Sequence, residues 1–204
     1  HKENTYSRKK LTIFFSDIVG FTEVSDKLDA ELLAEVLNNY LNEMVLIANK
    51  HGGTIDKFIG DAIVVFFGDP VSRGESEDAI SCVNMAFEMK NRILELRDVW
   101  HAKGIDKLLE VRIGINTGFV TVGDFGSEKR KDYTIIGKDA NIASRLQTAA
   151  EPGSILISNS TRLLVKHKFK TLNKGMIQVK GIAEPMQVFE LQGELSAIDP
   201  DWKI

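Results

Sequence analysis

The sequence predicts a single α+β domain with a ferredoxin-like βαββαβ core, extended by more strands and helices. The chain has 204 residues and is 43% hydrophobic, so it can bury a sizeable core, and one domain is the default at this length. Segments with strand and helix periodicity follow in the order strand, helix, paired strands, helix and strand, which is the split βαβ arrangement. The sequence contains no internal repeat.

The first strand and helix are expected within residues 11–50. The run LTIFFSDI at 11–18 is apolar and rich in β-branched residues, which is typical of a strand. From Asp29 to Lys50 apolar residues recur at helical spacing, so a long amphipathic helix is predicted there. Asp29 can cap its start, and the glycines after His51 mark its end.

A hairpin and a second long helix are expected next. Two strands, TIDKF at 54–58 and AIVVFF at 62–67, are joined by a tight turn with Asp61 near its tip. A helix is predicted over residues 75–102, because apolar residues recur along one face and Gly104 follows its end. The residues predicted to be buried on that face are Ala79, Ile80, Val83, Ala86, Phe87, Met89, Ile93 and Leu94.

The C-terminal half alternates between strands and helices. VRIGINTG at 111–118 and FVTVGDF at 119–125 are predicted to be two consecutive strands, followed by a charged loop at 126–132. A short strand at 133–136 and a helix over 139–150 come next. The remaining predictions are a strand at 154–158, a helix at 159–167, and strands at 168–172, 176–180 and 186–191.

Composition narrows the class of protein. A net charge of −3 and a pI near 5.9 argue against a nucleic-acid or membrane-surface binder, which needs a basic excess on one face. Cys82 has no partner for an internal disulfide and is expected in the core of a domain in a reducing compartment. No run approaches the roughly 18 apolar residues of a membrane span.

We expect a cytoplasmic domain that is part of a larger regulated protein. A linker or cut end is expected at 1–10, and a C-terminal tail is expected at 193–204.

Two acidic stretches carry the first candidate site. FFSDIVGFT at 14–22 and DKFIGDAIVVFF at 56–67 each place one carboxylate, Asp17 or Asp61, where a strand-like run ends or begins. An Asp there is most often a turn or N-cap residue, and Asp17 could cap a helix that begins near Thr22. Both, however, stand in apolar surroundings, where an unpaired carboxylate is costly unless a cation meets it. The pair therefore indicates a metal site, with backbone N–H groups after Asp17 available to an anion.

A second candidate constellation lies on the helix that follows Gly137. Asn141 and Arg145 are four residues apart, so they share one face of that helix. Arg can make forked hydrogen bonds to a phosphoryl group, and Asn can fix an ether or hydroxyl oxygen. Such a pair suits a ligand with several oxygens. Taken alone, an Asn–Arg pair is more typical of a solvated helix face.

The chain resembles the catalytic domain of class III adenylate and guanylate cyclases over residues 10–192. The resemblance rests on five stretches that occur in the family's order. They are FFSDIVGFT, DKFIGD, VRIGINTG, DYTIIGKDANIASRL and, at 179–181, VKG. It implies the class III nucleotidyl cyclase fold as the form of the α+β domain.

The resemblance also implies roles for individual residues. Two divalent ions, Mg²⁺ or Mn²⁺, would be held at Asp17, Ile18 and Asp61. The expected triphosphate segment comprises Ile18, Val19, Gly20, Phe21 and Thr22.

The remaining roles concern the purine, the ribose and the terminal phosphates. Lys57 matches the purine-reading residue of adenylate-specific members, where guanylate-specific ones usually have Glu. Thr134 matches the second purine-reading position and marks a subclass that often responds to bicarbonate. Asn141 and Arg145 match the pair that orients the ribose and stabilises the transition state. Lys180 matches a lysine that meets the terminal phosphates, although its VKG turn differs from the lysine-richer form, and Phe119 stands where some members carry a phosphate-contacting Arg.

The reaction implied is the attack of the ribose 3′ oxygen of ATP on the α-phosphorus, giving 3′,5′-cyclic AMP and pyrophosphate. Family sites lie between two catalytic domains, and this chain carries both halves, so the resemblance implies a head-to-tail homodimer. Asp17 and Asp61 of one chain would face Lys57, Thr134 and the Asn141–Arg145 pair of the other.

Alternatives of other kinds remain. One alternative is a cyclase that prefers GTP or accepts both purines. Lys57 argues against it, whereas Thr134 is compatible with it. A catalytically silent nucleotide-binding or dimerisation module would have no need for Asp17, Asp61 and the helix pair together. A diguanylate cyclase lacks support because its acidic hairpin signature is missing.

Overall fold

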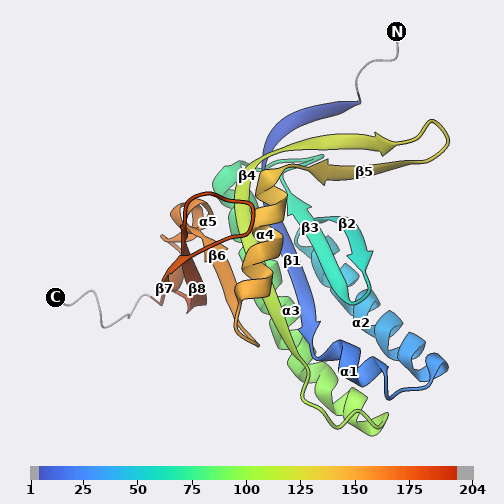
Figure 1. Cartoon of the computed structure of the whole chain (residues 1–204). Coiled ribbons are helices and arrows are strands. Elements are labelled where there is room, and N and C mark those ends of the chain that lie inside the picture. Colours follow the sequence, from blue (N-terminus) through green and yellow to red (C-terminus); the bar gives the residue numbers. More distant parts are fainter. Residues whose placement is uncertain (1–4, 197–204) are drawn as a thin grey trace.

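One mixed sheet organises the computed structural model, which describes residues 5–196 (Figure 1). The strand order is β2-β3-β1-β4-β6-β8-β7, and β5 pairs with β4 off this path. The strands are β1 (Tyr6–Val19), β2 (Thr54–Ile59), β3 (Ala62–Phe67), β4 (Glu110–Gly126), β5 (Lys131–Ile136), β6 (Ile155–Ser158), β7 (Phe169–Ile177) and β8 (Met186–Glu194). The helices are α1 (Phe21–Ser25), α2 (Ala30–Lys50), α3 (Glu75–Ala102), α4 (Lys138–Ala149) and α5 (Asn159–Val165). The predicted α+β class is confirmed.

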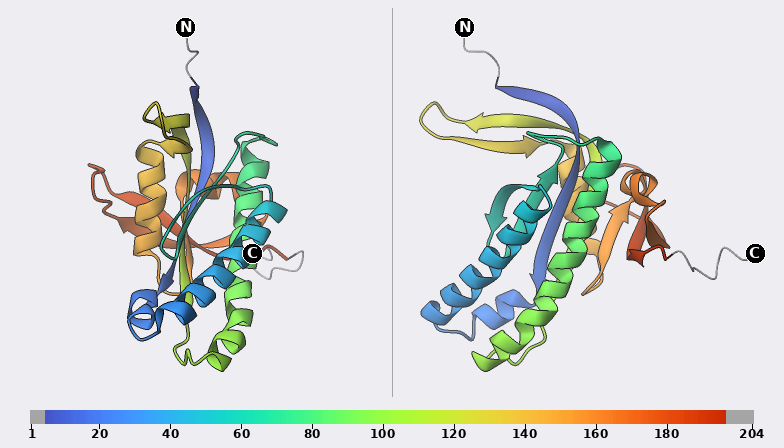
Figure 2. Two further views of the ribbon diagram at one scale, coloured as in Figure 1. Left: turned by 90° about the vertical axis from the view of Figure 1, so that its right-hand side faces the viewer. Right: turned by 180° about the vertical axis from the view of Figure 1, so that it is seen from behind.

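Alternation along the central strands creates two apolar layers. In β1, Phe14 and Ile18 point to the face covered by α2 and α3, where they join the largest core cluster with Tyr40 and Trp100. Ile13, the residue before Phe14, points to the opposite face, in a second cluster with residues of β4, β5 and α4. Figures 1 and 2 show α2 and α3 on one side of the sheet and α4 on the other. Because residues one apart on a strand face opposite sides, Asp17 lies on the α4 side.

The central strand β4 is one continuous strand, so the prediction of two strands meeting at Gly118 is wrong. The Asn-Thr-Gly sequence looks like a turn, but Asn116 and Thr117 are buried and pair with Ile13 and Thr12 of β1. The glycines serve close packing instead. A Cβ on Gly114 would overlap the backbone of Gln147, and one on Gly118 would overlap the Asp139 carboxylate. Both positions therefore let α4 lie directly on the strand.

The start of β1, the end of β4 and β5 form an arm that projects beyond the helices (Figure 1). Residues 6–10 pair with β4, so they belong to the sheet and not to the linker expected over residues 1–10; residues 1–4 lie outside the described part. Tyr6 stacks on Phe125 with ring centroids 5.8 Å apart. At the base of the arm, the buried Asp69 carboxylate accepts hydrogen bonds from Lys9 and Tyr133.

Most other element predictions are confirmed. Asp29 caps α2 by accepting a hydrogen bond from Leu32 N at 2.8 Å, and α3 spans the predicted residues. Leu94, predicted to be buried, is 46% exposed, whereas Cys82 is fully buried as expected.

The C-terminal strands differ more from the prediction. The two strands predicted at 168–172 and 176–180 are one irregular strand, β7. The last strand continues past the expected domain end at 192, and residues 197–204 of the expected tail lie outside the described part. Among the described residues, no helix is long and apolar enough to cross a membrane.

The close approach of α4 to β4 predicts that Gly114→Ala destabilises the domain. The added methyl meets backbone atoms, which cannot move aside as a side chain can, so the free energy of unfolding should fall by about 1–3 kcal/mol. Urea unfolding followed by circular dichroism measures this. Gly53→Ala is the matched control, since its methyl would meet the side chains of Val65 and Phe67. Equal stability of Gly114→Ala and the unaltered chain would contradict the packing argument.

Candidate active site

The two predicted carboxylates meet at one corner of the sheet. Asp17 lies near the end of β1, and Asp61 lies at the tip of the β2–β3 hairpin. Asp61 Oδ2 accepts a hydrogen bond from Ile18 N at 2.8 Å, which ties the hairpin tip to the strand end. Burial raises the pKa of Asp61, the Ile18 N–H group lowers it, and the negative charge of Asp17 raises it. Two carboxylates thus lie close together at this corner, and a bound cation would reduce the repulsion between them.

Asp17 does not cap a helix. The N-cap position of α1 is Gly20, with no side-chain capping bond, so the capping interpretation of Asp17 is wrong. Asp17 instead pairs with Arg112, which lies directly opposite on β4, with nitrogen–oxygen distances of 3.1 and 3.3 Å. Arg112 also donates to the carbonyl oxygen of Thr148 on α4. Sequence reasoning missed Arg112, because only the pairing register of β1 with β4 reveals its position.

These donors fit hard divalent ions such as Mg²⁺ or Mn²⁺. Carboxylate oxygens are their preferred protein ligands, and Mg²⁺ is commonly held by one or two carboxylates together with water and substrate phosphates. Within residues 5–196, no cluster of three or more His, Cys, Asp or Glu side chains could hold a metal. Asp17 and Asp61 therefore suit ions that are completed by a phosphate-bearing ligand rather than a closed structural metal site.

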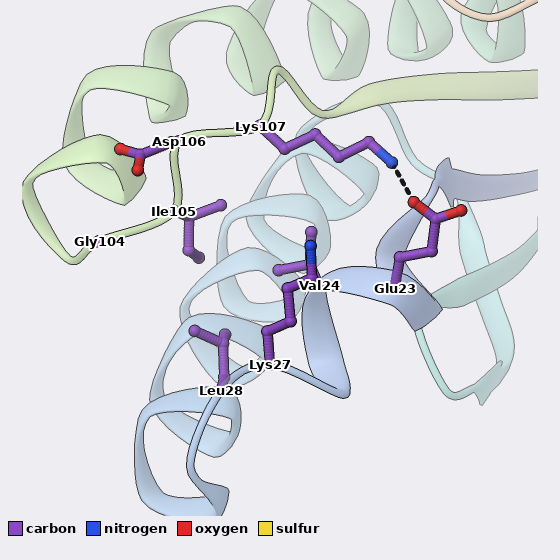
Figure 3. Close-up of a pocket in the computed structure, with 8 residues that line it drawn as sticks. All are labelled: Glu23, Val24, Lys27, Leu28, Gly104, Ile105, Asp106 and Lys107. Carbon is purple, nitrogen blue, oxygen red and sulfur yellow. Dashed lines mark hydrogen bonds and ion pairs between the residues drawn. The ribbon is translucent and has the colours of Figure 1, made fainter.

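The expected triphosphate segment forms the turn from β1 into α1. Gly20 has φ 74°, a left-handed conformation that favours glycine, while Ile18 and Phe21 anchor the turn in the core. Lys107 reaches this turn from the loop before β4 and donates to Glu23 Oε2 at 2.6 Å (Figure 3). This contact lowers the pKa of Glu23. Val19 lies half-buried beside the turn and Thr22 is exposed.

The two expected purine-reading residues lie on β2 and β5, two strands that contact each other but do not pair. Lys57 of β2 extends to within 3.6 Å of the Asp56 carboxylate. Burial raises the pKa of Asp56, and the Thr134 hydroxyl of β5 and the Lys57 ammonium both oppose that shift. Asp56 thus lies near both of the residues expected to read the purine, and sequence reasoning did not single it out.

The helix pair lies on the exposed face of α4. Asn141 and Arg145 are both exposed, and within the described residues their side chains make no hydrogen bond or ion pair. Asn141 lines a groove with Lys180 and Gly181 of the β7–β8 loop. The structure therefore brings Lys180 beside Asn141, as a shared phosphate and ribose site requires.

Asn141 and the carboxylates lie towards opposite ends of α4. Arg112 joins Asp17 to the carbonyl of Thr148 near the C-terminal end, whereas Asn141 lies in the first turn. Seven residues of helix span about 10 Å. The Asn141–Lys180 groove contains neither Asp17 nor Asp61. One chain consequently presents two separate half-sites on the same side of the sheet.

The fold is an α+β domain with two carboxylates at one corner of its sheet and an exposed Asn–Arg pair on α4. The chain belongs to the adenylate and guanylate cyclase catalytic domain family, whose model matches residues 3–193. It is similar to the crystal structure of the adenylyl cyclase CyaB from P. aeruginosa, with 53% identity, a TM-score of 0.91 and coverage of 93% of this chain and 96% of that one. It is also similar to the guanylyl cyclase Cya2, at 35% identity, TM-score 0.89 and coverage of 96% and 98%.

A curated relative extends well beyond the matched region. The adenylate cyclase of Anabaena cylindrica is 31% identical over 192 residues, which cover 91% of this chain and 37% of that protein. The chain spans about a third of the length of the curated relatives it matches first.

The Asp17–Arg112 pair yields a prediction about metal binding. Arg112→Gln leaves the Asp17 carboxylate without its guanidinium partner, so without divalent ions the melting temperature should fall by several degrees. Adding Mn²⁺ should then raise the melting temperature of the variant more than that of the unaltered chain, because the ion replaces the lost positive charge. Arg92→Gln, which breaks an exposed pair with Glu43 and Glu95, is the control and should show no extra response. Identical Mn²⁺ shifts in all three proteins would count against a metal at Asp17.

Proposed function

We propose that this domain is an adenylate cyclase that converts ATP to 3′,5′-cyclic AMP and pyrophosphate. The observation that carries the proposal is the joining of Asp17 and Asp61 through Ile18 N–H, in a chain that also retains Lys57 beside Thr134. A silent module would have no need for two carboxylates crowded at one corner. The high identity to the adenylyl cyclase CyaB supports the same proposal.

Each half-site has a defined task in this reaction. Asp17, Ile18 and Asp61 would hold two divalent ions, which supply charge neutralisation of the triphosphate and a lower pKa for the attacking 3′ hydroxyl. The backbone from Ile18 to Thr22 binds the triphosphate, and Lys180 meets the terminal phosphates. The reaction is intramolecular, so no side chain has to form a covalent intermediate.

The exposed helix pair acts on the ribose and on the developing charge. Asn141 orients the ribose, and Arg145 stabilises the transition state at the α-phosphate, where its planar guanidinium can donate two parallel hydrogen bonds. Their freedom from partners within the described residues keeps both side chains available for substrate.

The substrate site is proposed to form between two copies of the chain. The groove beside Asn141 contains neither carboxylate of its own chain, which supports a site completed by a second copy of the chain. A head-to-tail homodimer supplies two such sites, each with the carboxylates of one protomer and Lys57, Thr134, Asn141 and Arg145 of its partner.

Adenine is the proposed base because Lys57 is a hydrogen-bond donor without acceptor capacity. It can donate to N1 of adenine, whereas N1 of guanine carries a proton. The same proposal includes stimulation by bicarbonate, because Thr134 resembles the residue of the bicarbonate-responsive subclass. It also includes a cytoplasmic location, in keeping with the acidic composition.

Product formation tests the proposal directly. The purified chain with ATP and Mg²⁺ or Mn²⁺ should give cyclic AMP, with less cyclic GMP from GTP, as measured by chromatography. Arg145→Ala should lower kcat by about 10²-fold, because a charge that stabilises the transition state is lost. Arg162→Ala, whose guanidinium lies over Phe189 away from the half-sites, is the matched control. A folded, ATP-binding dimer without product would favour the silent module.

Mixing inactive variants tests the shared site. Asp17→Asn and Arg145→Ala each inactivate both sites of a homodimer, but a mixed dimer has one site with all residues intact. Since half of randomly assembled dimers are mixed, an equimolar mixture should recover about one quarter of the unaltered activity. Recovery is measured as cyclic AMP formed after equilibration. No recovery, with mixed dimers demonstrated by tagged subunits, would place each complete site within one chain.

A further inference from the structure

Lys107 lies in the loop between α3 and β4, and the apolar residues on either side of it fix its position. Ile105 and Leu109 are buried, whereas residues 106–108 between them are exposed. Ile105 N also donates a hydrogen bond to the carbonyl oxygen of Trp100, which holds the loop against the end of α3. The Lys107 side chain therefore extends from a well-anchored stretch of backbone, and Figure 3 shows it reaching across to α1.

The ammonium group of Lys107 lies against Gly20, in the middle of the segment proposed to bind the triphosphate. A Cβ atom on Gly20 would lie only 2.6 Å from Lys107 Nζ and 3.1 Å from Cε. Gly20 thus lacks a side chain for two reasons, its φ of 74° and the close approach of this lysine. The structure consequently places a cation directly on the turn whose backbone is expected to meet phosphate oxygens.

Glu23 is the partner of this ammonium in the structure, and the pair is exposed. Glu23 Oε2 accepts from Lys107 Nζ at 2.6 Å, and the two side chains are 73% and 47% exposed. The neighbouring acid, Asp106, pairs with His101 instead. An exposed ion pair contributes little to stability, because water solvates both charges well. Lys107 can therefore leave Glu23 at small cost for a phosphate group, to which it donates a stronger, charge-assisted hydrogen bond.

We propose that Lys107 is a further triphosphate-binding residue, which exchanges the Glu23 carboxylate for a phosphate oxygen when the nucleotide binds. This proposal rests on the proposed function and adds a residue to the carboxylate half-site. A triphosphate along residues 18–22 brings negative charge next to Glu23, and the ammonium between them reduces their repulsion. Lys180 lies beside Asn141 in the other half-site, so each half-site contributes its own lysine to the phosphates.

The alternative is that the ion pair only ties α1 to the loop before β4. In that case the loss of either partner would loosen the turn, and both losses would weaken phosphate binding alike. If Lys107 binds phosphate, the two losses act in opposite directions, because Glu23 competes with the phosphate for the same ammonium.

The test measures binding of inorganic tripolyphosphate with Mg²⁺ to the purified chain by titration calorimetry. Lys107→Met keeps most of the length of the side chain and removes its charge, so the dissociation constant should rise about tenfold. Glu23→Gln removes the competing carboxylate, so the dissociation constant should fall about threefold. Weaker binding in both variants would overturn the proposal in favour of the structural tie, and so would unchanged binding in Lys107→Met.

Lys27→Met is the matched control for the loss of one positive charge. Lys27 is exposed and lines the same pocket as Glu23 and Lys107 (Figure 3). The three atoms nearest to a Cβ on Gly20 nevertheless all belong to Lys107. Salt screens exposed charges that make no direct contact, so the dissociation constant of Lys27→Met should stay within about twofold of the unaltered value. A loss as large as that of Lys107→Met would show an effect of net charge alone and overturn the proposal.

Turnover separates this proposal from the proposed function. If the chain forms cyclic AMP, Lys107→Met should also raise KM for ATP about tenfold, in parallel with the weaker phosphate binding. If the unaltered chain forms no cyclic nucleotide, the cyclase proposal fails, and the tripolyphosphate titrations still decide the role of Lys107. If cyclic AMP forms but KM for ATP and tripolyphosphate binding are both unchanged in Lys107→Met, the cyclase proposal stands and the role of Lys107 is refuted.

Discussion

The pairing of β1 with β4 is the constraint on which the rest of the structure depends. Its unbroken antiparallel register runs from Tyr6 opposite Gly123 to Val19 opposite Glu110. One end of this ladder forms the base of the arm, and the other places Asp17 opposite Arg112. The middle brings Gly114 and Gly118 under α4, which sets how closely the helix carrying Asn141 can approach the sheet. A shift of one residue would turn every side chain of β1 to the other face and separate these features.

The carboxylate corner is stable in the absence of substrate because the chain supplies partial compensation for its charge. Asp17 has a guanidinium, and Asp61 has a backbone N–H group at the point where β1 ends. Burial, and to a smaller extent repulsion from Asp17, still raises the pKa of Asp61. Both carboxylates are held in place by the sheet, so their positions do not depend on a bound ligand.

Local patterns in the sequence were sufficient for most helices and strands, and the family signatures indicated the candidate site residues. The boundaries of α3 and the cap of α2 follow from spacing and a single Asp. The mistakes arose where long-range contacts override local signals. The sequence of Asn116–Gly118 is typical of a turn, but its polar side chains hydrogen-bond to Asp139 and to the buried Thr12. Residues 6–10 have no apolar periodicity, but they pair with a strand more than a hundred residues later.

The features that local patterns could not reveal gather at the half-sites, and there is a physical reason for this. Gly114 weakens a strand by its own propensity, a buried Asp56 costs desolvation, and the bulge beside it interrupts a ladder. Each is unfavourable for folding alone, so surrounding structure has to compensate for it. A fold tolerates such costs where they place a polar group at an exact position. The bulge at Asp56 is one instance, because it interrupts the register of β2 with β3 where a buried carboxylate lies 3.6 Å from the exposed ammonium of the next residue, Lys57.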